Sequence, residues 1–263
     1  DGAVLMLMDD VVFRKVLPEQ IQMAIAAQSA DDQKLYDVAW EVFAADEEES
    51  DPKDERWLVL SEEASILSSF QAELGDGHTF AKASEAPLDS LSQFTKVVSL
   101  IPMDDKLTPE DVLDSTLRLL QALAKSKEGG APSLWLLTTT TQPVSLGDMK
   151  GEPAPMHAGV WGLAKAFRNE HPDMEAVCLD LNPSVTSAPA IIHQVRTVSR
   201  QPSTSFEQEV AIREKEGAMQ LYAPRLVDCT DKVQVKDPAS FVEEATYVIS
   251  GGVGALGLVF AEW

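Results

Sequence analysis

The sequence has few cysteines and few basic residues. Its two cysteines, Cys178 and Cys229, do not form a CxxC pair, which excludes a disulfide framework and favours a reducing, intracellular compartment. Lysine and arginine number 21 against 43 aspartates and glutamates, giving a formal net charge of −22. An acidic surface repels phosphate backbones and anionic lipids. Nucleic acids and membrane surfaces are therefore poor partners for this chain.

Long hydrophobic runs are also missing. No run reaches the roughly 18 apolar residues of a candidate membrane span. The uncharged stretch at residues 248–261 is short and interrupted by glycines. The chain opens with DGAVLMLMDDVV, without an initiator methionine or a basic segment. This opening does not resemble a signal peptide, and it suggests a cut within a longer protein.

Several catalytic and metal-binding patterns are absent. The four histidines, His78, His157, His171 and His193, share no ligand spacing such as HxxxH. The acidic run at residues 45–55 lacks the DxDxDG spacing of calcium loops and is typical of a solvated loop. No GxSxG nucleophile elbow occurs. These absences disfavour a metalloprotein and an α/β-hydrolase.

Apolar runs of strand length alternate with helical patterns along most of the chain. Such alternation predicts a doubly wound α/β domain, with a parallel sheet covered by helices on both faces, over residues 35–227. A strand-like segment at 3–16 precedes this domain, and residues 228–246 form a polar linker after it. The predicted strands lie at 35–40, 57–60, 96–101, 133–139, 175–181 and 247–250, the helices at 62–74, 108–128, 156–170 and 190–198, and a hairpin at 209–226 turns around Gly217.

One helix is signalled more strongly than the others. Thr108 is placed to cap its N-terminus, Pro109 occupies the first helical position, and Asp111 is the third residue after the cap. Lys125 complements the dipole at the C-terminal end, and the glycines at 129–130 end the helix.

The most specific motif is a glycine-rich turn near the end of the chain. Its glycines match G-x-G-x-x-G between a predicted strand at 247–250 and a predicted helix from Leu258 onward, the context that dinucleotide binding requires. Backbone N–H groups at the helix N-terminus would face a pyrophosphate. The alternative is a glycine turn without a ligand. The candidate cofactor-binding residues are Ser250, Gly251, Gly252, Val253, Gly254, Ala255, Leu256 and Gly257.

Two further features carry weaker hypotheses. The threonine run at 138–141 lies at a strand end, where open α/β sheets bind ligands, but a β-branched strand terminus is the favoured interpretation. Trp161 lies on the apolar stripe of a predicted helix. We therefore expect Trp161 to serve in packing or as a lid rather than as a stacking platform.

The order of segments resembles the ketoreductase region of modular polyketide synthases and related type I fatty acid synthases. The segments are LYDVAW, WLVLSEE, LWLLTTTTQPV, HAGVWGLAKAFRNEHPDMEAVCLDL, EVAIREKEGAMQLYAPRL and YVISGGVGALG. The most specific piece begins at Gly162-Leu163-Ala164-Lys165 and continues through Glu170-His171-Pro172 to Asp180-Leu181. The opening, with DG and FRKV, is similar to the last strand of the dehydratase domain that often precedes this region.

The resemblance implies a division of the chain. Residues 1–34 would be the end of a preceding domain and a linker, and residues 35–227 a non-catalytic structural subdomain with a truncated, Rossmann-like fold of the short-chain dehydrogenase type. Residues 228–246 would be a linker, and 247–263 the first strand and glycine turn of a catalytic subdomain. Ser250 stands where the family usually has threonine, and Ala255 replaces a glycine that many members carry.

The resemblance also implies chemistry for the parent protein. It would reduce a β-ketoacyl thioester on an acyl carrier protein with NADPH, in a cytoplasmic or organellar synthase of several domains. The Ser, Tyr and Lys that such reductases use cannot be placed in this chain, so no catalytic residue is assigned. Its partners would be the catalytic subdomain and neighbouring synthase domains. Two alternatives are a catalytically silent scaffold and a free-standing Rossmann-like binding protein.

Overall fold

The computed structural model describes residues 35–44, 54–126, 130–144, 157–201, 206–230, 248–251, 254 and 257–258. The chain divides into two compact units, one of residues Val38–Val227 and one that combines Asp1–Asp37 with Asp228–Trp263. The expected strand at 3–16 and most of the acidic run at 45–55 lie outside the described residues. No helix in the described part has the length and apolar content to cross a bilayer.

The described strands form one eight-stranded sheet in the order β1-β8-β7-β6-β5-β4-β2-β3. The strands are β1 (Tyr36–Phe43), β2 (Trp57–Leu60), β3 (Thr79–Ala81), β4 (Lys96–Ser99), β5 (Ser133–Thr139), β6 (Ala176–Leu181), β7 (Glu209–Lys215) and β8 (Ala218–Asp228). Neighbouring strands from β3 through β7 are parallel, whereas β7 and β8 are antiparallel. The expected parallel sheet and the hairpin around Gly217 are confirmed.

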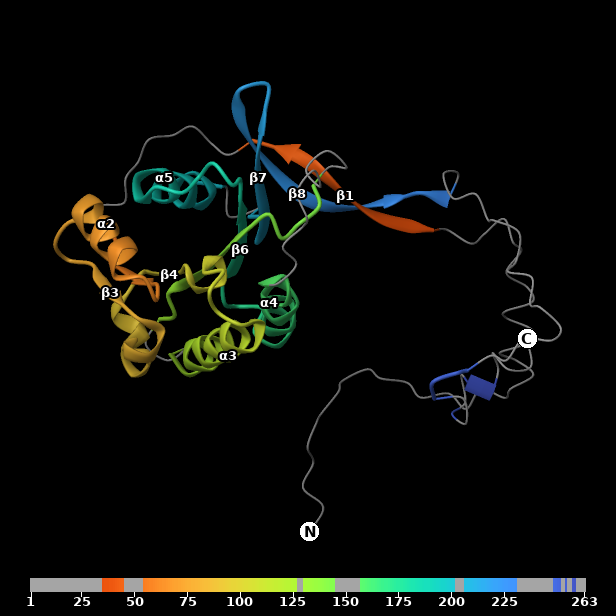
Figure 1. Ribbon diagram of the computed structural model, residues 1–263, viewed down its shortest axis with the longest axis horizontal. Coiled ribbons are helices and arrows are strands. Elements are labelled where there is room, and N and C mark those ends of the chain that lie inside the picture. Colours follow the sequence, from red (N-terminus) through yellow and green to blue (C-terminus); the bar gives the residue numbers. More distant parts are fainter. Residues whose placement is uncertain are drawn as a thin grey trace, which may run out of the picture. The chain divides into compact units, whose positions relative to one another are not determined.

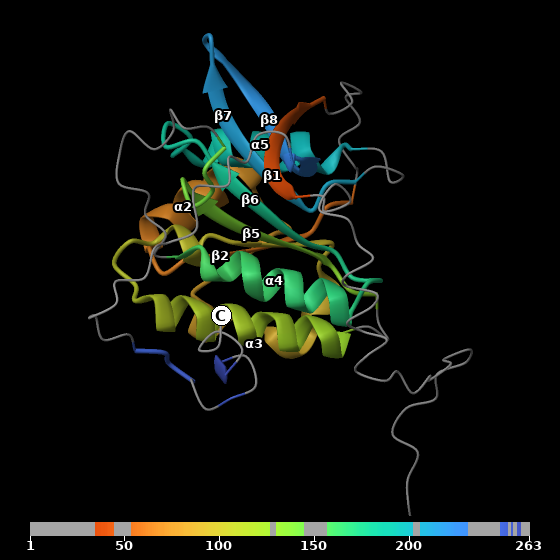
Figure 2. The same cartoon turned by 90° about the vertical axis from the view of Figure 1, so that its right-hand side faces the viewer.

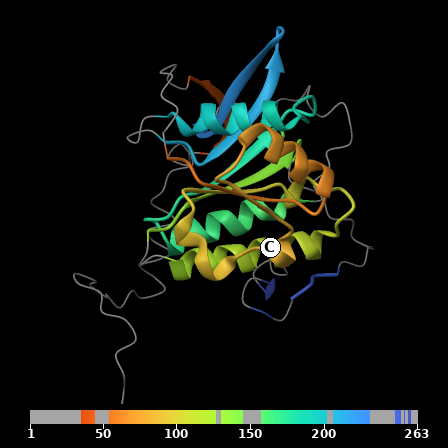
Figure 3. The ribbon, with the colours of Figure 1, turned by 90° about the vertical axis from the view of Figure 1, so that its left-hand side faces the viewer.

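Helices cover both faces of this sheet (Figure 1). Helices α3 (Pro109–Lys125) and α4 (Gly159–Glu170) lie on one face, and α2 (Ala64–Leu74) and α5 (Ala188–Ser199) on the other, as the two side views show (Figures 2 and 3). Two separate clusters of buried side chains fill these two layers. Because both faces are covered, β2, β4 and β6 are buried along their whole length, which explains their continuous apolar runs.

The helix boundaries follow the expected local signals. The Thr108 hydroxyl oxygen accepts a hydrogen bond from the Asp111 backbone N–H at 3.2 Å, and the hydroxyl donates to the Asp111 carboxylate at 2.7 Å. This side-chain cap, with Pro109 at the first position, confirms the predicted start of α3. Helix α2 ends at Gly75, whose φ of 78° lies in the left-handed region that glycine tolerates best.

Some short elements were not predicted. Strand β3 has only three residues, and three 3₁₀ turns, η2 (Ala83–Glu85), η3 (Leu88–Gln93) and η4 (Ile101–Met103), connect the parallel strands. The predicted strand at 96–101 stops at Ser99 because Ile101 and Pro102 begin η4. Elements of three to six residues contain less than two helical turns or two strand repeats, so they leave little periodicity in the sequence.

The amino ends of the central strands hold a buried lysine. The Lys96 Nζ lies 3.0 Å from Glu55 Oε1 and 2.9 Å from Ser199 Oγ, and it stands 4.9 Å from the ring centroid of Trp57 and 5.5 Å from that of Trp135. Burial lowers the pKa of Lys96 below its ordinary value of 10.5, and the Glu55 carboxylate partly opposes this shift.

This shift predicts how stability depends on pH. Because the folded pKa is lowered, the unfolded chain holds the Lys96 proton more tightly, so the contribution of Lys96 to the free energy of unfolding rises with pH between its folded pKa and 10.5. Denaturant titrations from pH 7 to 10.5 should show the stability of wild type rising relative to Lys96→Met. The exposed-lysine control Lys82→Met should follow the wild-type curve at a constant offset. Parallel curves for wild type and Lys96→Met would contradict the expectation.

Candidate functional site

A buried polar network closes the sheet at the carboxyl ends of β5 and β6. Asp180 lies within β6 and is fully buried. Its carboxylate accepts hydrogen bonds from the Thr138 hydroxyl at 2.6 Å, from the Thr141 hydroxyl at 2.9 Å, and from the backbone N–H groups of Thr141 and Gln142 at 3.0 and 3.1 Å. These donors hold the chain leaving β5 against β6.

Arg213 supplies the countercharge from β7. Its guanidinium donates to the Asp180 carboxylate and backbone oxygen, and to the backbone oxygens of Ile212 and Gln142. The Arg213 side chain is only 4% exposed. A buried carboxylate and guanidinium that satisfy each other in this way join β6, β7 and the segment after β5. The network thus occupies the carboxyl ends of β5 and β6 and fills them with side chains of the protein itself.

The threonine run and Trp161 belong to this network. Trp161, 4% exposed, donates its indole N–H to the Thr138 hydroxyl oxygen at 3.1 Å and packs edge-on against Trp40, with ring centroids 6.1 Å apart. The packing interpretation of Trp161 is therefore confirmed. The interpretation of Thr138 as a strand terminus is confirmed too, since β5 ends at Thr139. The hydroxyls of Thr138 and Thr141 are engaged within the protein.

Sequence reasoning noticed the Asp180-Leu181 pair but missed the role of Arg213. A signal was present, because AVCLDL carries Asp180 inside an otherwise apolar strand, and EVAIRE carries Arg213 directly after the apolar run Val210–Ile212. Two lone charges of opposite sign on strands that are buried must find partners, and neighbouring strands are the closest candidates.

The predicted cofactor turn lies in the smaller unit, where the structure describes four of its eight residues: Ser250, Gly251, Gly254 and Gly257. Gly251 has a φ of 73°, which favours glycine. The Gly254 N–H donates to the Gly251 carbonyl at 2.8 Å, and a Cβ added at Gly254 would stand 3.2 Å from that oxygen. Gly252, Val253, Ala255 and Leu256 lie outside the described residues.

The flanking elements of the turn differ from expectation in one respect. The strand predicted at 247–250 is wrong for Val248 to Ser250, which are not in a strand, while Tyr247 lies outside the described residues. Val248 is 92% exposed, and no described strand pairs with it. An isolated extended segment lacks the ladder of hydrogen bonds that defines a strand. Gly257 and Leu258 are helical, as expected for the start of the next helix.

Other reactive groups in the described part do not assemble into a site. No group of three or more histidine, cysteine or carboxylate side chains among the described residues could hold a metal ion. Cys178 is fully buried in β6, and burial raises the pKa of its thiol to about 12. A thiol in that state is a poor nucleophile near neutral pH.

The Asp180 network should carry much of the stability of the larger unit. We expect Asp180→Asn to lower the free energy of unfolding by about 3–5 kcal/mol, because it leaves the Arg213 charge buried without its carboxylate. The matched substitution Asp114→Asn disrupts an exposed pair with Arg118 and should cost about 0–1 kcal/mol. Denaturant unfolding measures both, and equal effects would contradict the role of the network.

Polyketide synthases are similar to this chain over most of its length. Polyketide synthase GfsA of Streptomyces halstedii is 32% identical over 183 residues, covering 67% of this chain and 2% of that protein. Pikromycin polyketide synthase component PikAIII of Streptomyces venezuelae is 28% identical over 257 residues, covering 92% of this chain and 15% of that protein. The chain therefore spans only a small part of these relatives.

Solved structures share the fold. One is described as the structure of A-type ketoreductases from a modular polyketide synthase, with a TM-score of 0.56 and 24% identity, covering 86% of this chain and 49% of that one. Another is an N-terminal ketoreductase from the macrolactin assembly line, with a TM-score of 0.58 and 16% identity, covering 94% and 54%. At these identities the likeness establishes a shared Rossmann-like fold.

The family comparison covers most of the larger unit. A family model described as the Rossmann-fold domain of polyketide synthase extender module SpnB matches residues 38–226. The match spans the sheet from β1 to β8 and all four of the described α-helices. The chain belongs to this family of Rossmann-fold domains of modular polyketide synthases.

Proposed function

We propose that residues 35–227 are the non-catalytic structural subdomain of a ketoreductase region in a modular polyketide synthase. In this proposal residues 1–34 end a preceding domain and form a linker, 228–246 are a linker, and 247–263 begin the catalytic subdomain. The catalytic subdomain would bind NADPH, with the turn from Ser250 to Gly257 as part of its pyrophosphate site. Family membership and the ketoreductase fold of the similar structures support this division.

One observation carries the proposal: the larger unit keeps a Rossmann-like sheet but has no phosphate cradle at its first strand–helix turn. After β2 the chain reads Ser61-Glu62-Glu63 instead of a glycine-rich sequence. Helix α2 begins after Glu63, so two carboxylates lie where a pyrophosphate would approach the helix N-terminus. Repulsion between carboxylates and phosphates disfavours a dinucleotide there.

The strand ends of β5 and β6 point to the same conclusion. The Asp180 carboxylate accepts hydrogen bonds from Arg213 and from the hydroxyls of Thr138 and Thr141, so these groups are engaged within the protein. A domain whose strand ends are held together by buried hydrogen bonds is suited to support a neighbouring domain. The neighbour, in this proposal, reduces a β-ketoacyl thioester carried on an acyl carrier protein by hydride transfer from NADPH.

A catalytically silent scaffold that organises neighbouring synthase domains is a second candidate. The buried hydrogen bonds of the sheet favour this scaffold as much as the reductase region, because the larger unit would be the same in both. The two candidates differ in the region that follows the chain in its parent. A Tyr-x-x-x-Lys within about 200 residues, a typical domain length, favours an active reductase.

The reductase proposal makes a prediction for activity. The 263-residue chain alone should not reduce a β-keto thioester with NADPH, because it contains no assigned proton donor. The parent region extended through the next domain should oxidise NADPH when the thioester is added, measured by the loss of absorbance of the reduced nicotinamide. Turnover by the chain alone would refute the structural role. If the extended protein is folded but shows no turnover, and its sequence lacks Tyr-x-x-x-Lys, the reductase proposal is wrong and the scaffold candidate remains.

The glycine turn yields a separate prediction for cofactor binding. In the extended protein, Gly254→Ala should weaken NADPH binding by about tenfold, equivalent to about 1.4 kcal/mol, because the added Cβ crowds the Gly251 carbonyl. Gly162→Ala is the matched control, since a Cβ at Gly162 meets nothing within 4 Å. Fluorescence titration with NADPH measures both dissociation constants. An unchanged value for Gly254→Ala would argue against a pyrophosphate on this turn.

A further inference from the structure

The order of strands reverses between β2 and β4. From β2 the chain passes through α2 to β3 on one side, and then returns past β2 to β4 on its other side. Counted from β2, the six parallel strands take the order 2-1-3-4-5-6, the doubly wound order 2-1-3-4-5 with one more strand, in which the connections leave the first and third strands toward opposite faces. Ligands of open α/β sheets bind in the crevice beyond the carboxyl ends of these two strands. In this protein that crevice lies beyond Leu60 and Ser99.

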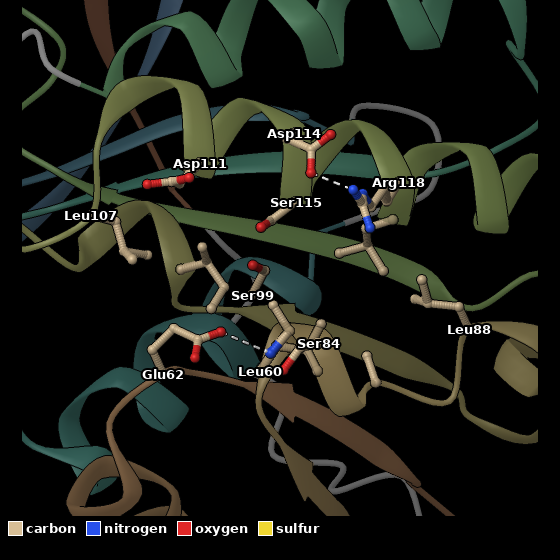
Figure 4. Close-up of a pocket in the computed structure, with 14 residues that line it drawn as sticks. Leu60, Glu62, Ser84, Leu88, Ser99, Leu107, Asp111, Asp114, Ser115 and Arg118 are labelled. Atoms are coloured by element: carbon tan, nitrogen blue, oxygen red, sulfur yellow. Dashed lines mark hydrogen bonds and ion pairs between the residues drawn. The ribbon is translucent and has the colours of Figure 1, made fainter.

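A cavity of about 390 Å³ occupies this crevice. Its volume falls within the range of about 300–1,000 Å³ that is usual for small-molecule sites. Leu60 and Ser99 line it from the ends of β2 and β4, Glu62 from the β2–α2 turn, and helix α3 forms the opposite wall (Figure 4). Leu60, Ile101 and Leu119 are 2–3% exposed and give the cavity an apolar floor. The cavity is built entirely from described residues of the larger unit.

Two hydroxyls in this cavity have no partner in the protein. Ser99 is 97% buried, at 3% exposure, yet among the described residues no group donates a hydrogen bond to its hydroxyl or accepts one from it. The same holds for the Ser115 hydroxyl on α3. Both hydroxyls point into the space between α3 and the strand ends (Figure 4). Ser99 is buried, whereas Ser115 is half-buried. Buried polar groups are nearly always hydrogen-bonded, so the open Ser99 hydroxyl facing a cavity indicates a water or ligand there.

The charged lining of the cavity is mainly negative. Glu62 accepts a hydrogen bond from the Ala83 N–H through one carboxylate oxygen, at 3.1 Å, and Asp111 accepts from Thr108 through one. Asp114 pairs through one oxygen with Arg118, at 2.8 Å. Each carboxylate thus has a second oxygen without a hydrogen-bond partner in the described part of the chain.

Arg118 is the only cationic side chain among the residues that line this cavity, and Asp114 neutralises it. Three carboxylates against one guanidinium give the lining a net charge of −2. The whole chain adds a formal charge of −22, which raises the local concentration of cations near its surface. A phosphate or carboxylate ligand is therefore disfavoured, and a cation is favoured.

We propose that this switch-point cavity binds a small organic ammonium ion. The ammonium group would donate hydrogen bonds to the Ser99 and Ser115 hydroxyl oxygens within the negatively charged lining, and the apolar part would lie against Leu60 and Ile101. An ammonium group has three donors and no acceptor, which matches this set of acceptors. The proposal is independent of the ketoreductase assignment, because the cavity belongs wholly to the larger unit.

Three probes of equal size and different charge test the proposal: cyclohexylammonium, cyclohexanol and cyclohexanecarboxylate. Each is titrated into the 263-residue chain at low salt and pH 7, and backbone amide shifts are followed by NMR. We expect saturable shifts at Ser99, Ser115 and Leu60 with cyclohexylammonium. We expect cyclohexanol to bind at least fivefold more weakly and cyclohexanecarboxylate to produce no saturable shift. Added salt should weaken the binding of the cation.

Variants show whether the binding is at the cavity. Asp114→Asn and Ser99→Ala should each raise the dissociation constant of cyclohexylammonium by about fivefold. Glu73→Gln removes the same charge from an exposed position on α2 outside the cavity, and it should leave the constant within twofold. Thermal unfolding of each variant shows that it is folded. Equal binding of all three probes, shifts that map elsewhere, or equal effects of Asp114→Asn and Glu73→Gln would each overturn the proposal.

Discussion

The buried pair of Asp180 and Arg213 fixes the carboxyl ends of β6 and β7 and the segment that follows β5. The two residues lie on adjacent parallel strands, in a register that pairs Asp180 with Ala211, so the Arg213 guanidinium must reach back along β7 to meet the carboxylate. In doing so it also holds the backbone oxygen of Gln142, beyond β5. A charge pair in this position is costly to disrupt, because either charge left alone would be buried. Three segments that are distant in sequence are therefore locked together.

A second buried charge lies at the opposite end of the strands, where their amino ends meet. Lys96, at the start of β4, is enclosed by Glu55, Ser199 and the rings of Trp57 and Trp135. Arg196 of α5 also reaches Glu55, at 3.6 Å. The contacts at the amino ends of the strands therefore hold α5 against the sheet, while those at the carboxyl ends hold β7 against β6. With both edges fixed, rearrangement of the central strands would require breaking buried charges, which suits a supporting role.

Much of the fold could be predicted because the sheet is covered on both faces. The run Trp57–Leu60 is fully buried, and continuous apolar segments of this kind are visible without any structure. Thr108 and Pro109 marked the start of α3 because caps act locally. The strand predicted before the glycine turn failed at Val248 for a nonlocal reason: an apolar segment becomes a strand only when another strand pairs with it. Arg213 was missed for the same reason, since its partner is 33 residues away in sequence.

Two turns that precede helices in this chain differ in the residues they present at the helix N-terminus: carboxylates in one and glycines in the other. After β2, Glu62 and Glu63 place carboxylates at the start of a helix, where the positive end of the helix dipole is available. In the later turn, the approach of Gly254 to the Gly251 carbonyl leaves little room for a side chain. Neither carboxylate caps the helix, because Glu62 accepts a hydrogen bond from the Ala83 N–H and Glu63 pairs with Lys106. The first turn is therefore compatible with support or with a cationic ligand, and only the second is compatible with a dinucleotide.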